Sequence, residues 1–386
     1  VSIRRAERPR REAIEELLSG EVVRTRRGRH FETERIWERH RRYGSVGIAD
    51  LADWDPDLLC ALSGGEIPHA APTKLAFLDT ETTGLGAGAC AFLVGVGSID
   101  AAGFRLRQFF MRDWDEEASL LGRLAEYLEQ FDALVTFNGR TFDQPLLEGR
   151  FYLYHMQHSL ARMPHLDLLF GARRLWRLRL DSCRLMDLET EVLGVERQGD
   201  LPGDLIPYYY FEFQRNHQAL RLVPIFHHNA LDILTLACLT PIVAEAFRTP
   251  AEAAVMHGAD LIGLARWLCD AKRRPEALTL LRRAVEMGLP DPLLFRTMWD
   301  IAREERRGGG TEAALEVWSD LAATRNPFRA QAMVELAKHH ERRAKNYAAA
   351  LEFTLQALAI GESPGLRRRE ERLRARLQAA RLKAIR

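Results

Sequence analysis

Several acidic side chains in this sequence stand where an apolar segment ends, which is a place where carboxylates can do chemistry. Asp79 and Glu81 follow the apolar run 75–78 and precede turn residues at 82–84. A short apolar run that stops at a turn signal predicts a buried strand, and alternation along a strand puts both carboxylates on one side. Buried carboxylates repel each other unless a divalent cation with oxygen ligands binds between them. A lone Asp-x-Glu is more often an acidic turn, so the interpretation depends on the rest of the chain.

A third carboxylate, Asp143, stands at the start of a predicted helix that runs to about residue 154. A predicted strand at residues 133–137 and an Asn138-Gly139 turn come just before it. Free N–H groups and the helix dipole favour a carboxylate at a helix start, so Asp143 alone indicates a helix cap. Ligand sites of open α/β sheets also form where a strand ends and a helix begins.

A fourth carboxylate, Asp232, lies within the apolar segment 231–239, which predicts a helix buried on most sides. A buried carboxylate is costly unless it is paired or binds a metal ion. His228 precedes Asp232 by four residues and shares its helical face, whereas His227 precedes it by five and points elsewhere. A His-x-x-x-Asp pair alone is more often a structural hydrogen-bonded pair.

Together these sites resemble the DEDD (DnaQ-like) superfamily of 3′→5′ exonucleases. The three motifs of that superfamily are matched by FLDTETTGL, NGRTFD and HHNALD, and the resemblance covers roughly residues 74–240. Segments 173–194 and 199–211 and the His-Asn-x-x-Asp pattern resemble, more narrowly, the YprB-like ribonuclease H-like branch. The tyrosine subclass has Tyr-x-x-x-Asp and the histidine subclass has His-x-x-x-x-Asp. Here His228 takes the first spacing and His227 the second, and the branch pattern and the helix geometry favour His228.

The resemblance implies a metal-dependent 3′→5′ exonuclease that hydrolyses phosphodiester bonds of single-stranded DNA or RNA. Two Mg²⁺ or Mn²⁺ ions, ~3.5–4 Å apart, would hold the attacking and leaving oxygens. By the same resemblance Asp79 contacts both ions, and Asp143 supports one of them. Glu81 and Asp232 hold the ion that binds the attacking water. His228 orients or deprotonates that water, a role that suits a group titrating near neutrality.

Other functions are compatible with the same residues. The alternative is a nucleic-acid-binding or scaffold protein that keeps the nuclease fold with weak or no catalysis. The intact set of four carboxylates argues against it, because a binding module has no need of them. Endonuclease or flap-type cutting and the choice between DNA and RNA stay open, since selection at the 2′-OH depends on pocket shape.

Two further groups of residues have two interpretations each. Asp167 lies at the end of a predicted strand, where it is either an outer partner of the site or a solvated turn residue. The aromatic run 208–211, three tyrosines and a phenylalanine, either stacks on bases of a single strand or packs within a helix. Packing is the favoured interpretation.

The elements that position the carboxylates follow the order β-β-β-α-β-α-β, which is that of a ribonuclease H-like sheet in an α/β fold. Short connections make the first three strands antiparallel neighbours, and a helical crossover makes the fourth parallel to the first. Flanking helices cover the sheet. After the first strand, the expected elements are strands at 91–99 and 104–111, a helix at 115–131, a strand at 133–137, a helix at 143–154 and a strand at 166–168.

The chain of 386 residues is expected to form three parts. Residues 1–72 are a small, arginine-rich N-terminal unit and linker that could contact phosphates, although arginine supplies most of the positive charge throughout the chain. Residues 73–249 form the exonuclease domain. Residues 250–386 form an all-α region in which an Ala-Leu pattern recurs about every 36 residues, similar to degenerate tetratricopeptide repeats. These repeats offer a groove for a protein partner or an extended substrate, or they brace the nuclease domain.

Composition narrows the class of protein further. The net charge of +1 gives no global nucleic-acid signal, although residues 367–386 predict a strongly basic helix. The five cysteines are dispersed without a C-x-x-C pair, which predicts reduced thiols and no zinc site. No apolar run of ~18 residues and no signal peptide are recognisable, so the sequence predicts a cytoplasmic protein without a membrane span.

Overall fold

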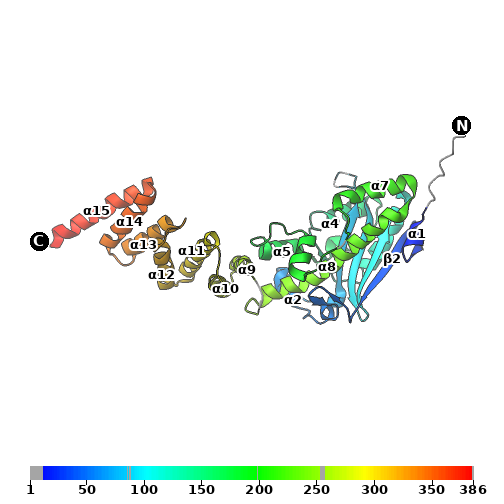
Figure 1. Cartoon of the computed structure of the whole chain (residues 1–386), viewed down its shortest axis with the longest axis horizontal. Coiled ribbons are helices and arrows are strands. Elements are labelled where there is room, and N and C mark those ends of the chain that lie inside the picture. The colour runs from blue at the N-terminus through cyan, green and yellow to red at the C-terminus, as the bar shows by residue number, and fades with distance from the viewer. Residues whose placement is uncertain (1–11, 85, 87, 198, 253–256, 385–386) are drawn as a thin grey trace, which may run out of the picture. The chain divides into compact units, whose positions relative to one another are not determined.

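The structure is a computed structural model that describes residues 12–84, 86, 88–197, 199–252 and 257–384. The chain divides into two compact units (Figure 1). The first unit comprises residues 1–173 and 180–249, and the second comprises residues 174–179 and 250–386. The arginine-rich stretch at residues 1–11 lies outside the described residues.

A seven-stranded mixed sheet forms the centre of the first unit, in the order β1-β2-β7-β6-β5-β8-β9. The strands from β1 to β5 along this order pair antiparallel, and β5, β8 and β9 pair parallel, which confirms the predicted mixed sheet. The strands are β1 (Gly20–Thr25), β2 (Gly28–Glu38), β5 (Leu75–Thr82), β6 (Ala91–Asp100), β7 (Gly103–Phe110), β8 (Ala133–Thr136) and β9 (His165–Asp167).

The N-terminal hairpin is part of this sheet. Strand β2 pairs with β7 from Phe31 to Glu38, and β1 extends the sheet by one further strand. The expected separate unit at residues 1–72 is therefore wrong for the hairpin. An isolated hairpin is marginally stable in water, and an unpaired edge of β7 would expose backbone hydrogen-bonding groups. The pairing of β2 with β7 therefore stabilises the hairpin and covers the edge of the sheet.

Helices cover both faces of the sheet. Helix α3 (Glu117–Leu128) buries Leu120, Leu121 and Leu124, a spacing that gives a helix one apolar face. The helices of this unit are α1 (Ile14–Leu17), α2 (Leu58–Leu62), α3, α4 (Asp143–Leu153), α5 (Leu168–Trp176, continuing into the second unit), α6 (Leu185–Leu188), the π-helical turn Glu189–Leu193, α7 (Ile206–Asn216) and α8 (Val223–Arg248).

The long helix α8 lies against strands β5, β6 and β7 (Figure 1). Two glycines of β6 make this close approach possible, because a Cβ atom on Gly95 or Gly97 would lie within 2.3 Å or 2.6 Å of Ile233. The stretch Ala219–Arg248 has the length and hydropathy of a membrane span, contrary to the expectation from sequence, but 72% of its most apolar window is buried inside the structure. Its apolar character is therefore that of a core helix.

The second unit is a succession of helices in which each helix packs against the next. Three alanines of the recurring sequence pattern, Ala277, Ala314 and Ala350, are fully buried, which gives the pattern a packing role. This confirms the all-helical region, and its assignment to tetratricopeptide repeats stays a prediction. The helices are α9 (Gly258–Asp270), α10 (Arg274–Glu286), α11 (Asp291–Gly308), α12 (Thr311–Ala323), α13 (Arg329–Arg342), α14 (Tyr347–Ile360) and α15 (Pro364–Ala384).

Candidate active site

Strand β5 turns Asp79 and Glu81 toward helix α8. Asp79 pairs with Gly95 and Glu81 pairs with Leu93 across the antiparallel ladder to β6. The absence of a side chain at Gly95 admits Asn229 of α8, whose Nδ2 donates a hydrogen bond to Asp79 Oδ2 at 2.9 Å. Glu81 is only 8% exposed. The sheet and α8 therefore bury Glu81 and leave Asp79 half-buried.

Asp143 opens helix α4 and is also 8% exposed. Thr80, which lies between the two carboxylates of β5, donates a hydrogen bond to Asp143 Oδ1 at 2.5 Å. The structure thus brings Asp143 beside the end of β5, as the sequence motifs predict.

Asp167 anchors the loop that leads to Asp143. Its carboxylate accepts the backbone N–H of Asn138 at 2.7 Å and of Arg140 at 3.2 Å. Asn138 has φ of 68°, a left-handed conformation that needs such support. Asp167 is 4% exposed, so it is not a solvated turn residue. It shapes the loop before α4, a role that neither interpretation from the sequence included.

Helix α8 supplies the fourth carboxylate and the histidine. Asp232 Oδ2 lies 3.5 Å from His228 Nε2, as expected for residues one turn apart. His228 is 9% exposed, whereas His227 is an exposed residue of the same helix. Of the two histidines that the sequence left open, His228 is the one that lies at the carboxylates.

The four carboxylates oppose one another's ionisation. Burial, followed by repulsion from Asp143 and Asp232, raises the pKa of Asp79 well above its ordinary value. Burial and then Asp79 do the same to the pKa of Glu81. Burial raises the pKa of Asp143 to about 6, although the hydrogen bond from Thr80 lowers it. Burial also raises the pKa of Asp232, against the opposing effects of His228 and Arg197.

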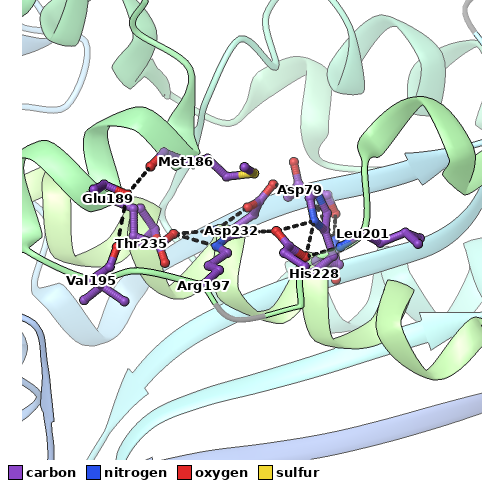
Figure 2. A network of polar contacts seen from close by, with 12 residues as sticks. Asp79, Met186, Glu189, Val195, Arg197, Leu201, His228, Asp232 and Thr235 are labelled. Carbon is purple, nitrogen blue, oxygen red and sulfur yellow. Dashed lines mark hydrogen bonds and ion pairs between the residues drawn. The ribbon is translucent and has the colours of Figure 1, made fainter. Parts of the chain in front are cut away.

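Arg197 is a buried cation that sequence reasoning missed. Its side chain is 5% exposed and contacts Asp232 at 2.6 Å and Glu189 at 2.5 Å (Figure 2). It also contacts a third carboxylate, that of Asp200, at 3.0 Å. Glu189, on the π-helical turn, also accepts hydrogen bonds from Tyr43 and Thr235, each at 2.7 Å. Arg197 lies between the two segments that resemble the YprB-like branch, and that resemblance was the only signal for this region.

Asp200 is the second residue that the sequence did not single out. Its two carboxylate oxygens lie 2.9 Å and 3.0 Å from Nδ1 of His228. Burial opposes ionisation of Asp200, but the contacts with His228 and Arg197 outweigh it and lower the pKa of this carboxyl group. The site therefore places the ionised carboxylate of Asp200 against His228, beside the four-carboxylate cluster.

The aromatic run at residues 208–211 contains one buried ring and two exposed rings, and base stacking stays a prediction. Tyr210 is fully buried and stacks on Phe92 with ring centroids 3.9 Å apart, which is helix packing as favoured. Tyr208 and Phe211 are 52% and 39% exposed. These two side chains are thus accessible to a ligand.

Carboxylate oxygens are the ligands that hard divalent cations such as Mg²⁺ or Mn²⁺ prefer. The raised pKa values show the cost of gathering these carboxylates without a cation. Within the described ranges, no group of three or more Asp, Glu, His or Cys side chains stands ready to hold an ion. Instead one oxygen of each of three carboxylates is taken by a protein donor: Asn229 at Asp79, Thr80 at Asp143 and Arg197 at Asp232.

Comparisons with known proteins identify the family of this chain. A family model described as RNase_H superfamily matches residues 76–243, the stretch from β5 into α8 that carries all four carboxylates. The uncharacterized protein YprB of Bacillus subtilis (strain 168) is 32% identical over 294 residues, which cover 74% of this chain and 69% of that protein. Residues 76–243 thus form an RNase H-like domain, which is a nuclease fold, and the chain belongs to the family of YprB.

Proposed function

We propose that this protein is a metal-dependent 3′→5′ exonuclease that hydrolyses phosphodiester bonds of nucleic acid. One observation supports the proposal: Asp79, Glu81, Asp143 and Asp232 come from three separate elements and are linked by electrostatic repulsion, and His228 lies 3.5 Å from Asp232. Gathering four mutually repelling carboxylates at a site without a ligand would only destabilise the fold. Two bound Mg²⁺ or Mn²⁺ ions would remove that cost. The exonuclease polarity rests on the resemblance of the three motifs to DEDD enzymes.

The four carboxylates would hold the ions, which in such sites polarise the phosphodiester and activate water as the nucleophile. Asn229 fixes the orientation of Asp79 through the hydrogen bond to Oδ2. His228, whose Nε2 faces Asp232, would take a proton at that nitrogen. Tyr208 and Phe211 are exposed aromatic side chains of α7 that could stack on unpaired bases.

A labelled-substrate assay tests the proposal directly. The full chain is incubated with 3′- or 5′-labelled DNA and RNA, with Mg²⁺, Mn²⁺ or a chelator. We expect metal-dependent shortening from the 3′ end. Asp79→Ala and Asp143→Asn should each abolish it. The control variant Asp115→Asn, which changes an exposed carboxylate at a helix start, should leave it unchanged. Cleavage that survives both cluster variants, or that persists in excess chelator, contradicts the proposal.

A second candidate is a nucleic-acid-binding or scaffold protein on the same fold. The observation that favours it is the ion pair between Arg197 and Asp232, since an inactive site could keep a protein cation in place of a metal ion. Retained binding of labelled single strands without any cleavage, with every metal tried, would support this candidate. The helical second unit would then serve as the surface for a protein partner.

A further inference from the structure

The side chain of His228 is held from the side opposite to the carboxylate cluster. Asp200, on the loop between the π-helical turn and α7, lies 2.9 Å and 3.0 Å from Nδ1 of His228 through its two oxygens. The side chain of Asp200 is 9% exposed and that of His228 is 11% exposed, so both are largely buried. The other ring nitrogen, Nε2, lies 3.5 Å from Asp232 Oδ2. The imidazole therefore bridges a carboxylate outside the cluster and a carboxylate within it.

This geometry determines which nitrogen carries the proton. An ionised carboxylate has no hydrogen to donate, so the contact with Asp200 requires a hydrogen on Nδ1. A neutral imidazole has one N–H, and Nε2 is then left with its lone pair. That lone pair is directed to the side of the ring where the four carboxylates lie.

Asp200 is itself held in place. Arg197 donates to Asp200 Oδ2 at 3.0 Å while it also contacts Glu189 and Asp232. The backbone N–H of Leu201 donates to Asp200 Oδ1 at 2.9 Å. These contacts fix the loop against α8, so the carboxylate of Asp200 has little freedom to leave His228.

We propose that Asp200 is a positioning residue: it holds His228 in the tautomer protonated at Nδ1 and directs Nε2 toward the carboxylate cluster. The kinetic consequence of this inference rests on the proposed hydrolysis, whereas the tautomer does not. During hydrolysis the oxygen of water bonds to phosphorus and the bond from phosphorus to the leaving oxygen breaks. The proton of the water passes to Nε2 of His228, the leaving oxygen takes a proton from solvent, and Asp200 stabilises the resulting imidazolium.

The tautomer can be measured without any assay of cleavage. Nitrogen NMR of ¹⁵N-histidine-labelled full chain, at a pH where imidazole is neutral, distinguishes the two ring nitrogens, and His228→Gln identifies the signals. We expect Nδ1–H in the wild type and a shift toward Nε2–H in Asp200→Ala and Asp200→Asn. Asp204→Asn, an exposed carboxylate of the same segment, should leave the signals unchanged. An Nε2–H tautomer in the wild type, or an unchanged tautomer in Asp200→Ala, overturns the inference.

Kinetics then separate positioning from a merely structural role. Asp200→Asn should lower kcat roughly 10²-fold with little change in KM, within the range that a positioned base contributes. Asp200→Glu should recover part of that loss. In a His228→Ala background, Asp200→Asn should cause no further loss, because it acts through the missing imidazole. A further loss of similar size in that background refutes positioning, and thermal unfolding of each variant reports on the fold. If the wild type cleaves no substrate, the proposed function fails while the NMR result still decides the role of Asp200.

Discussion

Replacing Asp143 by asparagine in the metal-free protein should stabilise the fold. Burial raises the pKa of Asp143 to about 6 from an ordinary value of 3.8, so the folded protein pays in stability when this group ionises. That interval corresponds to about 3 kcal/mol. Asparagine can still accept the hydrogen bond from Thr80, but its amide N–H groups need new partners. We therefore expect a net gain of roughly 1–3 kcal/mol, or about 3–8 °C in Tm.

The sign of the pH dependence follows from the raised pKa. The folded protein keeps the proton of Asp143 to a higher pH than the unfolded chain does, so the penalty is absent below about pH 4. It grows as the pH rises and is complete above about pH 7. Asp143→Asn should thus stabilise the protein at pH 7.5 and have little effect near pH 4. Added Mg²⁺ should raise the Tm of the wild type more at pH 7.5 than at pH 4.5, because only ionised carboxylates bind it well.

Thermal unfolding in chelator measures this prediction. The wild type, Asp143→Asn and the control Asp115→Asn are compared at pH 4.5 and pH 7.5, with and without Mg²⁺. The control removes an exposed carboxylate near a helix start, so its Tm should stay close to that of the wild type. If Asp143→Asn leaves the Tm unchanged or lowers it at pH 7.5, then burial does not penalise the ionised Asp143 carboxylate as the structure indicates.

Three further predictions follow from the site. His228→Ala should lower the cleavage rate by ~10²–10⁴ while His227→Ala changes it little, as measured by initial rates; the reverse order would make the five-residue spacing the active one. Arg197→Met leaves the fully buried Glu189 without its cation and should lower the free energy of unfolding by about 3 kcal/mol, as measured with denaturant. A second change, Glu189→Gln, should recover part of that loss. An unchanged free energy of unfolding in Arg197→Met would show that the hydrogen bonds from Tyr43 and Thr235 are enough to stabilise Glu189. Single-stranded 3′ ends should be trimmed faster than blunt duplex ends, because fraying a paired base costs a few kcal/mol; equal initial rates on the two forms of one labelled oligonucleotide would count against this preference.

The sequence by itself determined the mixed sheet and the elements that carry the four carboxylates. Those predictions depend on local signals: apolar runs that end at turns, helical spacing of leucines and acidic residues at element ends. Such signals are read within a few residues, so β5, α4 and α8 could be placed with Asp79, Asp143 and Asp232 on them. Short connections then left little choice in how the first strands pair.

Only the tertiary structure decided which partners these residues have. Arg197 and Asp200 lie in an irregular segment with no periodic pattern, yet they contact α8 about 30 residues further along the chain. The sequence did not reveal that the N-terminal strands join the central sheet, because pairing between β2 and β7 depends on strand edges that are distant in sequence. The sequence left the role of Asp167 open between an outer partner of the site and a turn residue, and the backbone N–H of Asn138 that donates to it belongs to a distant loop. Contacts of this kind depend on how elements pack, and no spacing within one element encodes them.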